Sequence, residues 1–575
     1  MDSVKQQLQE IVSAAFVAAG YSAEYGEVAL SQRPELGDFQ CNGALAAARP
    51  YKQNPRQIGE AVAKQLEGHP LISGVNLAGA GFLNLRLAGG FVAQMVQQMA
   101  ADSERLGVNT AASPQTIIVD YGGANVAKPL HVGHVRTALI GESLKRLCRF
   151  LGHQAVGDIH MGDWGLQMGQ IIVELASRYP DLPYFDASYT GPYPAESPIT
   201  IAELEEVYPI ASAKSKSDPV VKAAAQLATT ELQNGRAGYR ALWQHFVNVS
   251  IADLKKNYDT LDVHFELWLG ESDVQHLIPP MLEMLKENGH AVMSEGALVM
   301  YVAEEEDKKK LPPLMLVTSQ EAVGYGTTDL ATIWQRVQEY DPDAILYVVD
   351  GRQQDHFHQV FRAAYKSGIA DKAKLTLEHN YFGTVNGPDG KPFKTRDGGT
   401  LKLEDFIDMM IAKAYERMAE IGAAADYPEA ERAEIARQVG LAALKFGDLV
   451  NHRTGDYIFD IERFSSFEGR TGPYLLYAAV RTRSILRKAA ELGFLPSEVG
   501  TAASDEERDV QLKLLELPET LQHAFATRAP NHLCEYAFSL ATVFNRFYRQ
   551  HHILTEPNAD QQASWLALCQ VVVHA

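Results

Sequence analysis

Two histidines and a lysine in the first third of the chain have the types and spacing to act on a phosphate. They lie in Asn125-Val126-Ala127-Lys128-Pro129-Leu130-His131-Val132-Gly133-His134. His131 and His134 share one face of a helix at this spacing, and imidazole N–H groups can donate to a phosphate whose charge rises during transfer. Lys128 comes just before the expected helix and can reach a triphosphate as a mobile point charge. The segment therefore predicts a site for a phosphate-bearing ligand.

Gly133 lies between the two histidines, where a glycine costs about 1 kcal/mol relative to alanine in a helix. The usual reason to keep such a glycine is a ligand that comes close to the backbone. The segment follows an apolar run at residues 116–121 and precedes a helical pattern over residues 135–151. A strand, a tight turn and a helix form half of a parallel α/β unit, whose ligands lie beyond the strands and against helix N-termini.

Two other interpretations of the histidine pair stay open. An HxxH pair can bind a metal ion, but a site needs a third ligand and none is close in the sequence, so we predict no metal site. Alternatively, the two side chains simply pack.

A second candidate is the Gly-rich stretch at residues 388–399, which contains Lys391, Lys394 and Arg396. Such a loop can close over phosphates with its cations and backbone amides. The alternative is a solvated hairpin.

Three segments are expected to position these residues. Residues 1–112 have the pattern of a small α+β domain, with Leu83, Leu85 and Leu87 alternating along a strand. Residues 113–402 alternate strands (117–120, before 160, 344–349) with helices (131–151, 356–367), which is typical of a doubly wound parallel α/β sheet. Residues 180–219, rich in Pro, Ser and Tyr, predict an insertion in it.

From residue 403 the strands are expected to stop. Amphipathic helices over residues 406–421, 431–450, 474–492 and 532–551 predict an all-α C-terminal domain, residues 403–575.

Composition narrows the class of protein. A chain of 575 residues is too long for one core. Its four dispersed cysteines form no CxxC pair, which is typical of a reducing compartment. Residues 1–7 lack a basic segment before an apolar core, and no apolar run approaches the roughly 20 residues of a membrane span. We therefore expect a cytoplasmic protein. The net charge of −20 argues against a nucleic-acid partner, although local basic patches can survive it.

Together these stretches resemble the class I aminoacyl-tRNA synthetases. The residues His131-Val132-Gly133-His134 match the HIGH signature of that class, and residues 393–396 resemble its KMSKS loop. The resemblance narrows to the arginyl-tRNA synthetases and covers nearly the whole chain. It is carried, in this order, by residues 125–134, 160–165, 325–329, 391–396 and 466–474.

The resemblance implies ATP-dependent activation of L-arginine to arginyl-adenylate, with release of pyrophosphate. Transfer to the 2′-hydroxyl of the terminal adenosine of tRNA(Arg) follows. It also implies Mg²⁺ carried with ATP, arginine activation that generally needs bound tRNA, and a monomer. Its catalytic residues would be Lys128, His131 and His134, with Gly133 against ATP.

The same resemblance assigns an arginine pocket. A guanidinium binds a carboxylate in fork geometry, which Asp329 offers; the alternative is that Asp329 caps a helix beginning at Leu330. The implied pocket residues are Asn125, Tyr325, Asp329 and Gln353.

The KMSKS-like loop departs from the pattern of the class, because Pro392 and Thr395 stand at its two usual lysine positions. We expect Lys128 to supply the missing charge, with Lys394 and Arg396 as secondary ATP contacts.

Both outer domains are expected to bind tRNA. By resemblance, residues 403–575 form the anticodon-binding domain, where Tyr477, Arg481, Phe547 and Tyr548 suit stacking on unpaired bases. Residues 1–112 resemble the domain that touches the tRNA elbow, through Asp38, Phe39 and Asn42. The alternatives are core aromatics and, for Asn42, a helix cap.

The family usually continues past residues 566–570 with a further helix and tail, whereas here residues 571–575 end the sequence. We therefore expect uncovered apolar surface on the last helix. Two other functions stay open for the whole chain: another HxGH nucleotidyltransferase, and a catalytically inactive synthetase-like RNA-binding protein.

Overall fold

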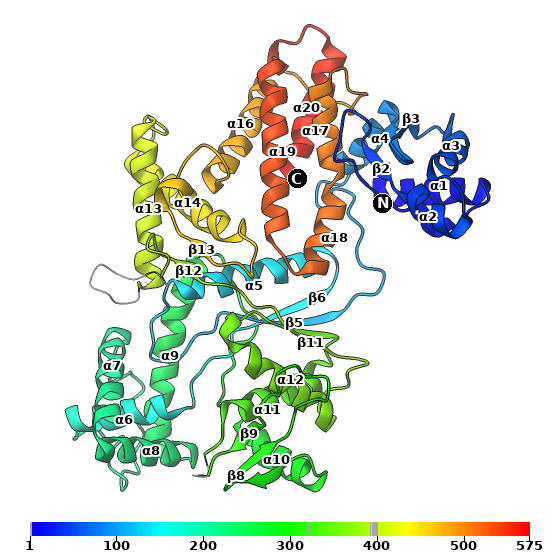
Figure 1. Cartoon of the computed structure of the whole chain (residues 1–575). Coiled ribbons are helices and arrows are strands. Elements are labelled where there is room, and N and C mark those ends of the chain that lie inside the picture. The colour runs from blue at the N-terminus through cyan, green and yellow to red at the C-terminus, as the bar shows by residue number, and fades with distance from the viewer. Residues whose placement is uncertain (1–2, 320–321, 392, 394–400) are drawn as a thin grey trace. The chain divides into compact units, whose positions relative to one another are not determined.

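The computed structural model of the chain contains two compact units (Figure 1). One unit comprises Met1–Ala111 with Phe467–Ala575, and the other comprises Ala112–Ser466. The structure describes residues 3–319, 322–391, 393 and 401–575. Among these residues, no helix combines the length and the apolar character that crossing a membrane requires.

A parallel sheet forms the centre of the unit Ala112–Ser466. Its strands are β5 (Thr116–Asp120), β6 (Gln154–Asp158), β10 (Ala344–Tyr347) and β11 (Thr376–His379), in the order β11-β10-β5-β6. The buried runs of β5 and β10 are typical of strands covered on both faces. The chain passes from β5 to β6 on one side of the β5–β10 pair and from β10 to β11 on the other side. A ligand crevice is therefore expected between the carboxyl ends of β5 and β10.

Helices cover both faces of this sheet. Figure 1 shows α5 (Gly133–Phe150) on one side and α11 (Tyr325–Tyr340) and α12 (Gln354–Ser367) on the other. The predicted doubly wound α/β fold is therefore confirmed.

The insertion after α6 (Leu166–Arg178) is helical, which its Pro-rich composition did not suggest. Thr200 and Glu203 form a capping box that starts α7 (Ile201–Ser217), and α8 (Pro219–Gln233) and α9 (Ala237–Thr260) follow. The four helices share one core, which also buries Val126 and Ala127.

A small antiparallel sheet was also not predicted. It contains β7 (Val292–Ser294), β8 (Ala297–Met300) and β9 (Leu314–Val317), and packs with α10 (Ile278–Glu287) in the same core as α11 and α12.

The helices α13 (Leu403–Glu420), α14 (Glu429–Leu449) and α15 (Ile461–Phe464) lie in this unit, although the sequence patterns had grouped them with the C-terminal helices. A buried ion pair explains why: Arg136 Nε of α5 lies 3.2 Å from Asp448 Oδ1 of α14. In addition, β12 (Val385–Asn386) pairs with β13 (Tyr457–Ile458). The expectation that strands stop at residue 403 is therefore wrong.

The other unit begins with the predicted α+β domain. Its antiparallel sheet, in the order β1-β2-β4-β3, contains β1 (Val28–Leu30), β2 (Phe39–Cys41), β3 (Ile72–Ala78) and β4 (Phe82–Leu87). The leucines that alternate along β4 are buried, as expected. Its helices are α1 (Val4–Ala18), α2 (Gly43–Tyr51), α3 (Pro55–Leu66) and α4 (Gly89–Ala100).

The remainder of this unit, Phe467–Ala575, is the C-terminal part of the predicted helical domain. It contains α16 (Gly472–Glu491), α17 (Asp505–Leu515), α18 (Leu517–Thr527), α19 (Asn531–Gln550) and α20 (Ala559–His574). The apolar side chains of α20 from Trp565 to Val571 are buried, and Val572 and Val573 are half-buried. The uncovered apolar surface expected on this helix is therefore not found.

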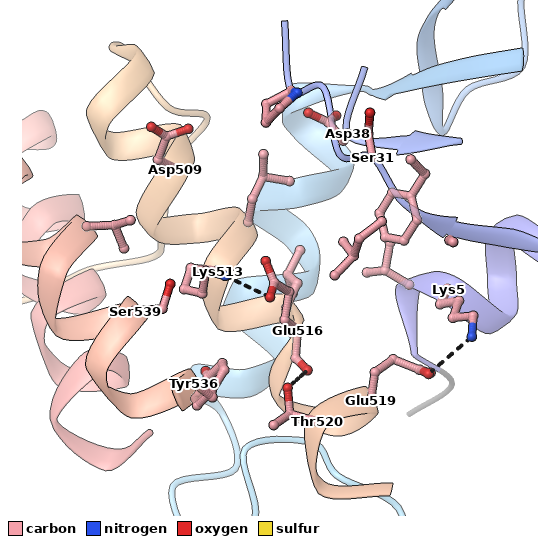
Figure 2. A pocket seen from close by; sticks show the side chains of 18 of the residues that line it. Lys5, Ser31, Asp38, Asp509, Lys513, Glu516, Glu519, Thr520, Tyr536 and Ser539 are labelled. Carbon is pink, nitrogen blue, oxygen red and sulfur yellow. Dashed lines mark hydrogen bonds and ion pairs between the residues drawn. The ribbon is translucent and has the colours of Figure 1, made fainter. Parts of the chain in front are cut away.

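A cavity of about 1000 Å³ lies between the sheet β1-β2-β4-β3 and helices α17 to α19 of this unit (Figure 2). Its carboxylates already have partners: Glu516 pairs with Lys513 at 2.8 Å and Glu519 with Lys5 at 3.8 Å. The contact between Lys5 and Glu519 joins the two parts of the unit, and the two pairs leave the cavity without a clear charge preference.

A buried arginine joins the sheet of the larger unit to α11. One terminal nitrogen of Arg336 lies 2.6 Å from both Asp120 Oδ2 and Asp158 Oδ2, at the carboxyl ends of β5 and β6. Burial opposes charge on Arg336, yet the two carboxylates hold its pKa well above the ordinary value. The cluster is therefore an ion triad inside the protein.

We predict that Arg336→Met lowers the free energy of unfolding by about 3–5 kcal/mol, because it leaves two buried carboxylates without their cation. Urea unfolding at neutral pH measures this change. The matched control is Arg437→Met, which removes an exposed partner of Glu434 and should cost less than about 1 kcal/mol. Equal effects of the two substitutions would contradict the prediction.

Candidate active site

The loop that leaves β5 is held by backbone contacts that aim Lys128. Val126 N–H donates to the carbonyl of Gly162 at 3.0 Å, and Ala127 N–H donates to Ser250 Oγ at 3.0 Å. Ala127 has a left-handed φ of 62°, which costs a residue with a β-carbon about 1–2 kcal/mol. Strain of this kind is typical of functional loops, where the surrounding contacts enforce it.

The two histidines are held against each other, with their ring centroids 4.0 Å apart. His131 N–H donates to Nδ1 of His134 at 3.0 Å, and Gly133 N–H donates to Nδ1 of His131 at 3.1 Å. Nδ1 of His131 is thus an acceptor, so the neutral His131 ring carries its proton on Nε2. Nδ1 of His134 lies 3.0 Å from His131 N and 3.3 Å from His131 O, so its contacts fit either tautomer of the His134 ring. The arrangement provides an imidazole N–H donor on His131, with the His134 ring beside it.

Both rings are neutral at pH 7. Burial, followed by the neighbouring His131 ring, lowers the pKa of His134 to about 3. Desolvation and then Arg352 lower the pKa of His131 below its ordinary value. Neutral donors can strengthen their hydrogen bonds as negative charge develops, without first attracting a counter-ion.

Gly133 has a local reason to be glycine. A β-carbon there would lie 2.8 Å from Cε1 of His131, so a side chain at this position would displace the imidazole. Room for a nucleotide, the reason inferred from the sequence, stays a prediction.

The described residues supply no third ligand for the metal interpretation of the histidine pair: they contain no group of three or more His, Cys, Asp or Glu side chains placed to hold a metal ion. The packing interpretation does not fit His131, which lies at the surface.

Tyr325 and Asp329 lie one turn apart at the start of α11. Because the helix begins at Tyr325, Asp329 lies inside it, and the helix-cap interpretation of Asp329 is wrong. Asp329 Oδ2 lies 2.5 Å from Nε2 of His356 on α12, so one carboxylate oxygen is held and the other is left for a ligand. Tyr325 is 73% exposed.

Asn125 and Gln353 follow the two strands that border the crevice. Asn125 pairs with Gly162, where an added β-carbon would lie 2.4 Å from the Asn125 side-chain oxygen. Gly162 therefore makes room for this amide. Gln353 ends the short helix η3 (Gly351–Gln353), just beyond β10.

Glu271 is a candidate that the sequence patterns missed. Burial, followed by the carboxylates of Asp163 and Asp329, raises the pKa of Glu271 to about 7. Asp163 fixes the adjoining loop, since it accepts from Ser272 N–H at 2.9 Å and Ser272 Oγ at 2.6 Å. An isolated glutamate in a loop gives no sequence signal. The electrostatic effects of Asp329 and Lys128 on Glu271 place all three in one region.

The KMSKS-like loop is only partly described. Pro392, Lys394, Thr395 and Arg396 lie outside the described residues. The chain that follows returns to the histidine segment: Val132 N–H donates to Leu401 O at 3.0 Å, and Leu403 N–H donates to Leu130 O at 2.9 Å. One end of the loop is thus fixed beside His131.

The helical domain brings three of the predicted tRNA-binding residues together. The Arg481 guanidinium lies 4.6 Å from the ring centroid of Tyr477 and 5.3 Å from that of Tyr548. Arg481 Nη1 also donates to Asn545 at 2.7 Å. Phe547 is wholly buried and packs on Trp565, so its prediction as a base-stacking residue is wrong.

The elbow-contact residues of the small domain are placed differently from one another. The Asp38 side chain is 7% exposed and pairs with Arg508 at 2.7 Å. Phe39 as a whole residue is also 7% exposed. Their prediction as direct tRNA contacts is therefore corrected, because both side chains serve the interior of the unit. Asn42 is exposed, and its side chain accepts from Gln40 at 2.6 Å instead of capping α2.

Comparisons with known proteins match all three parts of the chain. The model of the class I (R) tRNA synthetase catalytic domain matches residues 95–461. The arginyl tRNA synthetase N-terminal domain matches residues 2–87, and the DALR anticodon binding domain matches residues 475–574. The chain belongs to the arginyl-tRNA synthetase family.

Individual members of this family agree with that assignment. An arginine–tRNA ligase of Alkaliphilus oremlandii is 51% identical, over 100% of this chain and 97% of its own length. One from Maricaulis maris is 50% identical over the same shares of the two chains. The solved arginyl-tRNA synthetase of Plasmodium falciparum has a TM-score of 0.81 at 23% identity, covering 100% of this chain and 96% of that one, and so shares the fold.

In this arginyl-tRNA synthetase family member, we predict that the KM for arginine rises about tenfold between about pH 8 and about pH 6. Glu271, with its pKa raised to about 7, is charged above that pH and loses its attraction for the arginine cation below it. Steady-state pyrophosphate exchange across this range measures the effect.

Glu271→Gln should give a high KM for arginine that varies little with pH. Glu283→Gln, at an exposed position of α10, is the control and should keep the original profile. A pH-independent KM for arginine in the unmodified protein would show that the Glu271 carboxylate does not bind arginine.

Proposed function

We propose that the chain ligates L-arginine to tRNA(Arg) in two steps. The arginine carboxylate attacks the α-phosphorus of ATP, the bond to the β-phosphate oxygen breaks, and pyrophosphate leaves. The 2′-hydroxyl of the terminal adenosine then attacks the carbonyl of arginyl-adenylate, loses its proton and displaces AMP. The observation that carries this proposal is the pair of adjacent neutral imidazoles near Lys128, at the switch point of a parallel sheet.

The phosphate side of the site is assigned to Lys128, His131 and His134. The two imidazoles donate to phosphate oxygens as the charge on them grows, and Lys128 adds a full positive charge. Gly133 lets the His131 ring take its place. Lys394 and Arg396 are proposed as further ATP contacts.

The arginine side is assigned to Asn125, Tyr325, Asp329 and Gln353, together with Glu271. Asp329 and Glu271 supply the negative charge that a guanidinium and an ammonium group need. A pocket with several acceptors discriminates strongly against lysine, because lysine leaves some of them unpaired.

Magnesium is proposed to arrive with ATP. The described residues offer no cluster of three or more acidic or histidine side chains for it, and Mg²⁺ in nucleotide sites is commonly held largely by phosphates and water. We further propose that the protein works as a monomer in the cytoplasm.

For tRNA, we propose two contact regions. The group of Tyr477, Arg481 and Tyr548, of which Tyr477 is exposed and the other two are half-buried, is suited to bases that leave the stack, since aromatic and guanidinium planes stack on any base. Asn42 remains the elbow contact assigned to the small domain.

Pyrophosphate exchange with and without tRNA tests the proposal against the alternatives. Exchange that depends on arginine supports it. Exchange without arginine dependence would indicate another HxGH nucleotidyltransferase, and tRNA binding with no exchange would indicate an inactive RNA-binding relative.

We predict that Lys128→Ala slows arginyl-adenylate formation at least about tenfold, because a cation near the reacting phosphates is lost. The measurement is the rate of pyrophosphate exchange at saturating arginine and tRNA. Lys286→Ala, at an exposed position of α10, is the control and should leave the rate unchanged. A normal rate for Lys128→Ala would remove Lys128 from the mechanism.

We predict that Tyr477→Ala raises the KM for tRNA in the charging reaction about tenfold, the loss expected for one stacking contact. Phe547→Leu should instead lower the melting temperature and leave that KM within about twofold, because its ring is buried in the core. If the effects are reversed, the base-binding surface lies elsewhere on the helical domain.

A further inference from the structure

The insertion helix α7 presents two side chains to lysines that flank the phosphate site. Tyr208 and Glu205 are three residues apart and so share a face of the helix. The ammonium nitrogen of Lys128 lies 4.9 Å from the centroid of the Tyr208 ring. Glu205 Oε2 lies 2.5 Å from Nζ of Lys402.

These two lysines adjoin the histidine signature from different parts of the chain. Lys128 comes shortly before His131 in sequence. Lys402 follows the KMSKS-like loop, and its backbone pairs antiparallel with that of His131. One face of α7 therefore contacts a lysine of the histidine segment and a lysine just beyond the KMSKS-like loop.

The helix is fixed relative to the backbone that carries Lys128. Leu204 and Val207, on the buried face of α7, belong to the same core as Val126 and Ala127, and all four are at most 1% exposed. The buried core thus holds the Tyr208 ring beside the loop that carries Lys128.

The partner that each lysine has on α7 determines whether its positive charge stays available to a phosphate. An aromatic ring attracts an ammonium group without neutralising it, so Lys128 keeps a full charge for phosphate. A carboxylate in the place of Tyr208 would compete with the triphosphate for the same cation. The carboxylate on this face, Glu205, pairs with Lys402 instead, and this hydrogen bond raises the pKa of Lys402.

We propose that Tyr208 and Glu205 are positioning residues for ATP-dependent activation. Tyr208 holds the Lys128 ammonium in place before ATP binds, and Glu205 fixes the end of the KMSKS-like loop through Lys402. The inference rests on the proposed function, since it requires Lys128 to act on ATP.

The test uses the full-length protein with saturating arginine and tRNA. Tyr208→Leu removes the ring and keeps an apolar side chain, and should lower kcat for pyrophosphate exchange about fivefold, as expected for one cation–π contact. Tyr208→Phe keeps the ring and should stay within about twofold. The KM for arginine should not change in either variant.

A double-mutant cycle separates positioning from a structural role. If Tyr208 acts through Lys128, then Tyr208→Leu has no further effect on kcat once Lys128→Met is present. If the two effects multiply, the inference is overturned. If thermal unfolding shows that the Tyr208→Leu variant is not folded, Tyr208→Met takes its place in the same cycle.

Glu205 is tested against its neighbour. Glu205→Gln should lower kcat about two- to fivefold, in line with a single partly exposed ion pair, whereas Glu206→Gln, which removes a partner of Arg178 at 3.2 Å, should not. Unmodified protein without arginine-dependent exchange would overturn the proposed function. Active protein with normal kcat in both Tyr208→Leu and Glu205→Gln would overturn only this inference.

Discussion

The placement of Arg336 between Asp120 and Asp158 constrains much of the larger unit. Inside a protein, one cation shared by two carboxylates is favourable only in a narrow geometry, and losing that geometry exposes charges that water no longer solvates. The triad therefore fixes α11 against the carboxyl ends of β5 and β6. Those ends also start the loops that carry Asn125 and His160. The side chains assigned to arginine on α11 and the loop assigned to ATP thus share one anchor.

The site separates two opposite electrostatic requirements over a short distance. A cationic amino acid needs carboxylates, and a triphosphate needs cations and donors. In the proposed assignment, Asp329 and Glu271 meet the first requirement, and Lys128 and the two neutral imidazoles meet the second. The Gly133 N–H donates to Nδ1 of His131, so the main chain selects the tautomer of that ring. The net charge of −20 carries no information about this local arrangement.

Sequence patterns predicted what depends on local periodicity. The apolar runs of β5 and β10 and the helices that follow the turns were found because neighbouring residues determine them. The same patterns could not find Glu271, whose position depends on Asp163 about one hundred residues away. Nor could they separate Phe547, in the core, from Tyr548 beside it, because helical spacing alone does not show which aromatic faces solvent. The helix α7 was hidden by Pro209 and by a Pro-rich approach, yet a capping box starts it.

Ala127 illustrates how stability and activity can meet at one residue. Its left-handed backbone would favour glycine by about 1–2 kcal/mol, whereas its methyl group, wholly buried among helices α6 to α9, favours alanine by about 0.8 kcal/mol. The two preferences nearly cancel, so folding free energy imposes little selection between alanine and glycine here. Alanine, however, leaves the chain fewer conformations than glycine just before Lys128. Selection at this position would therefore act on the conformational entropy of the loop that leads to Lys128.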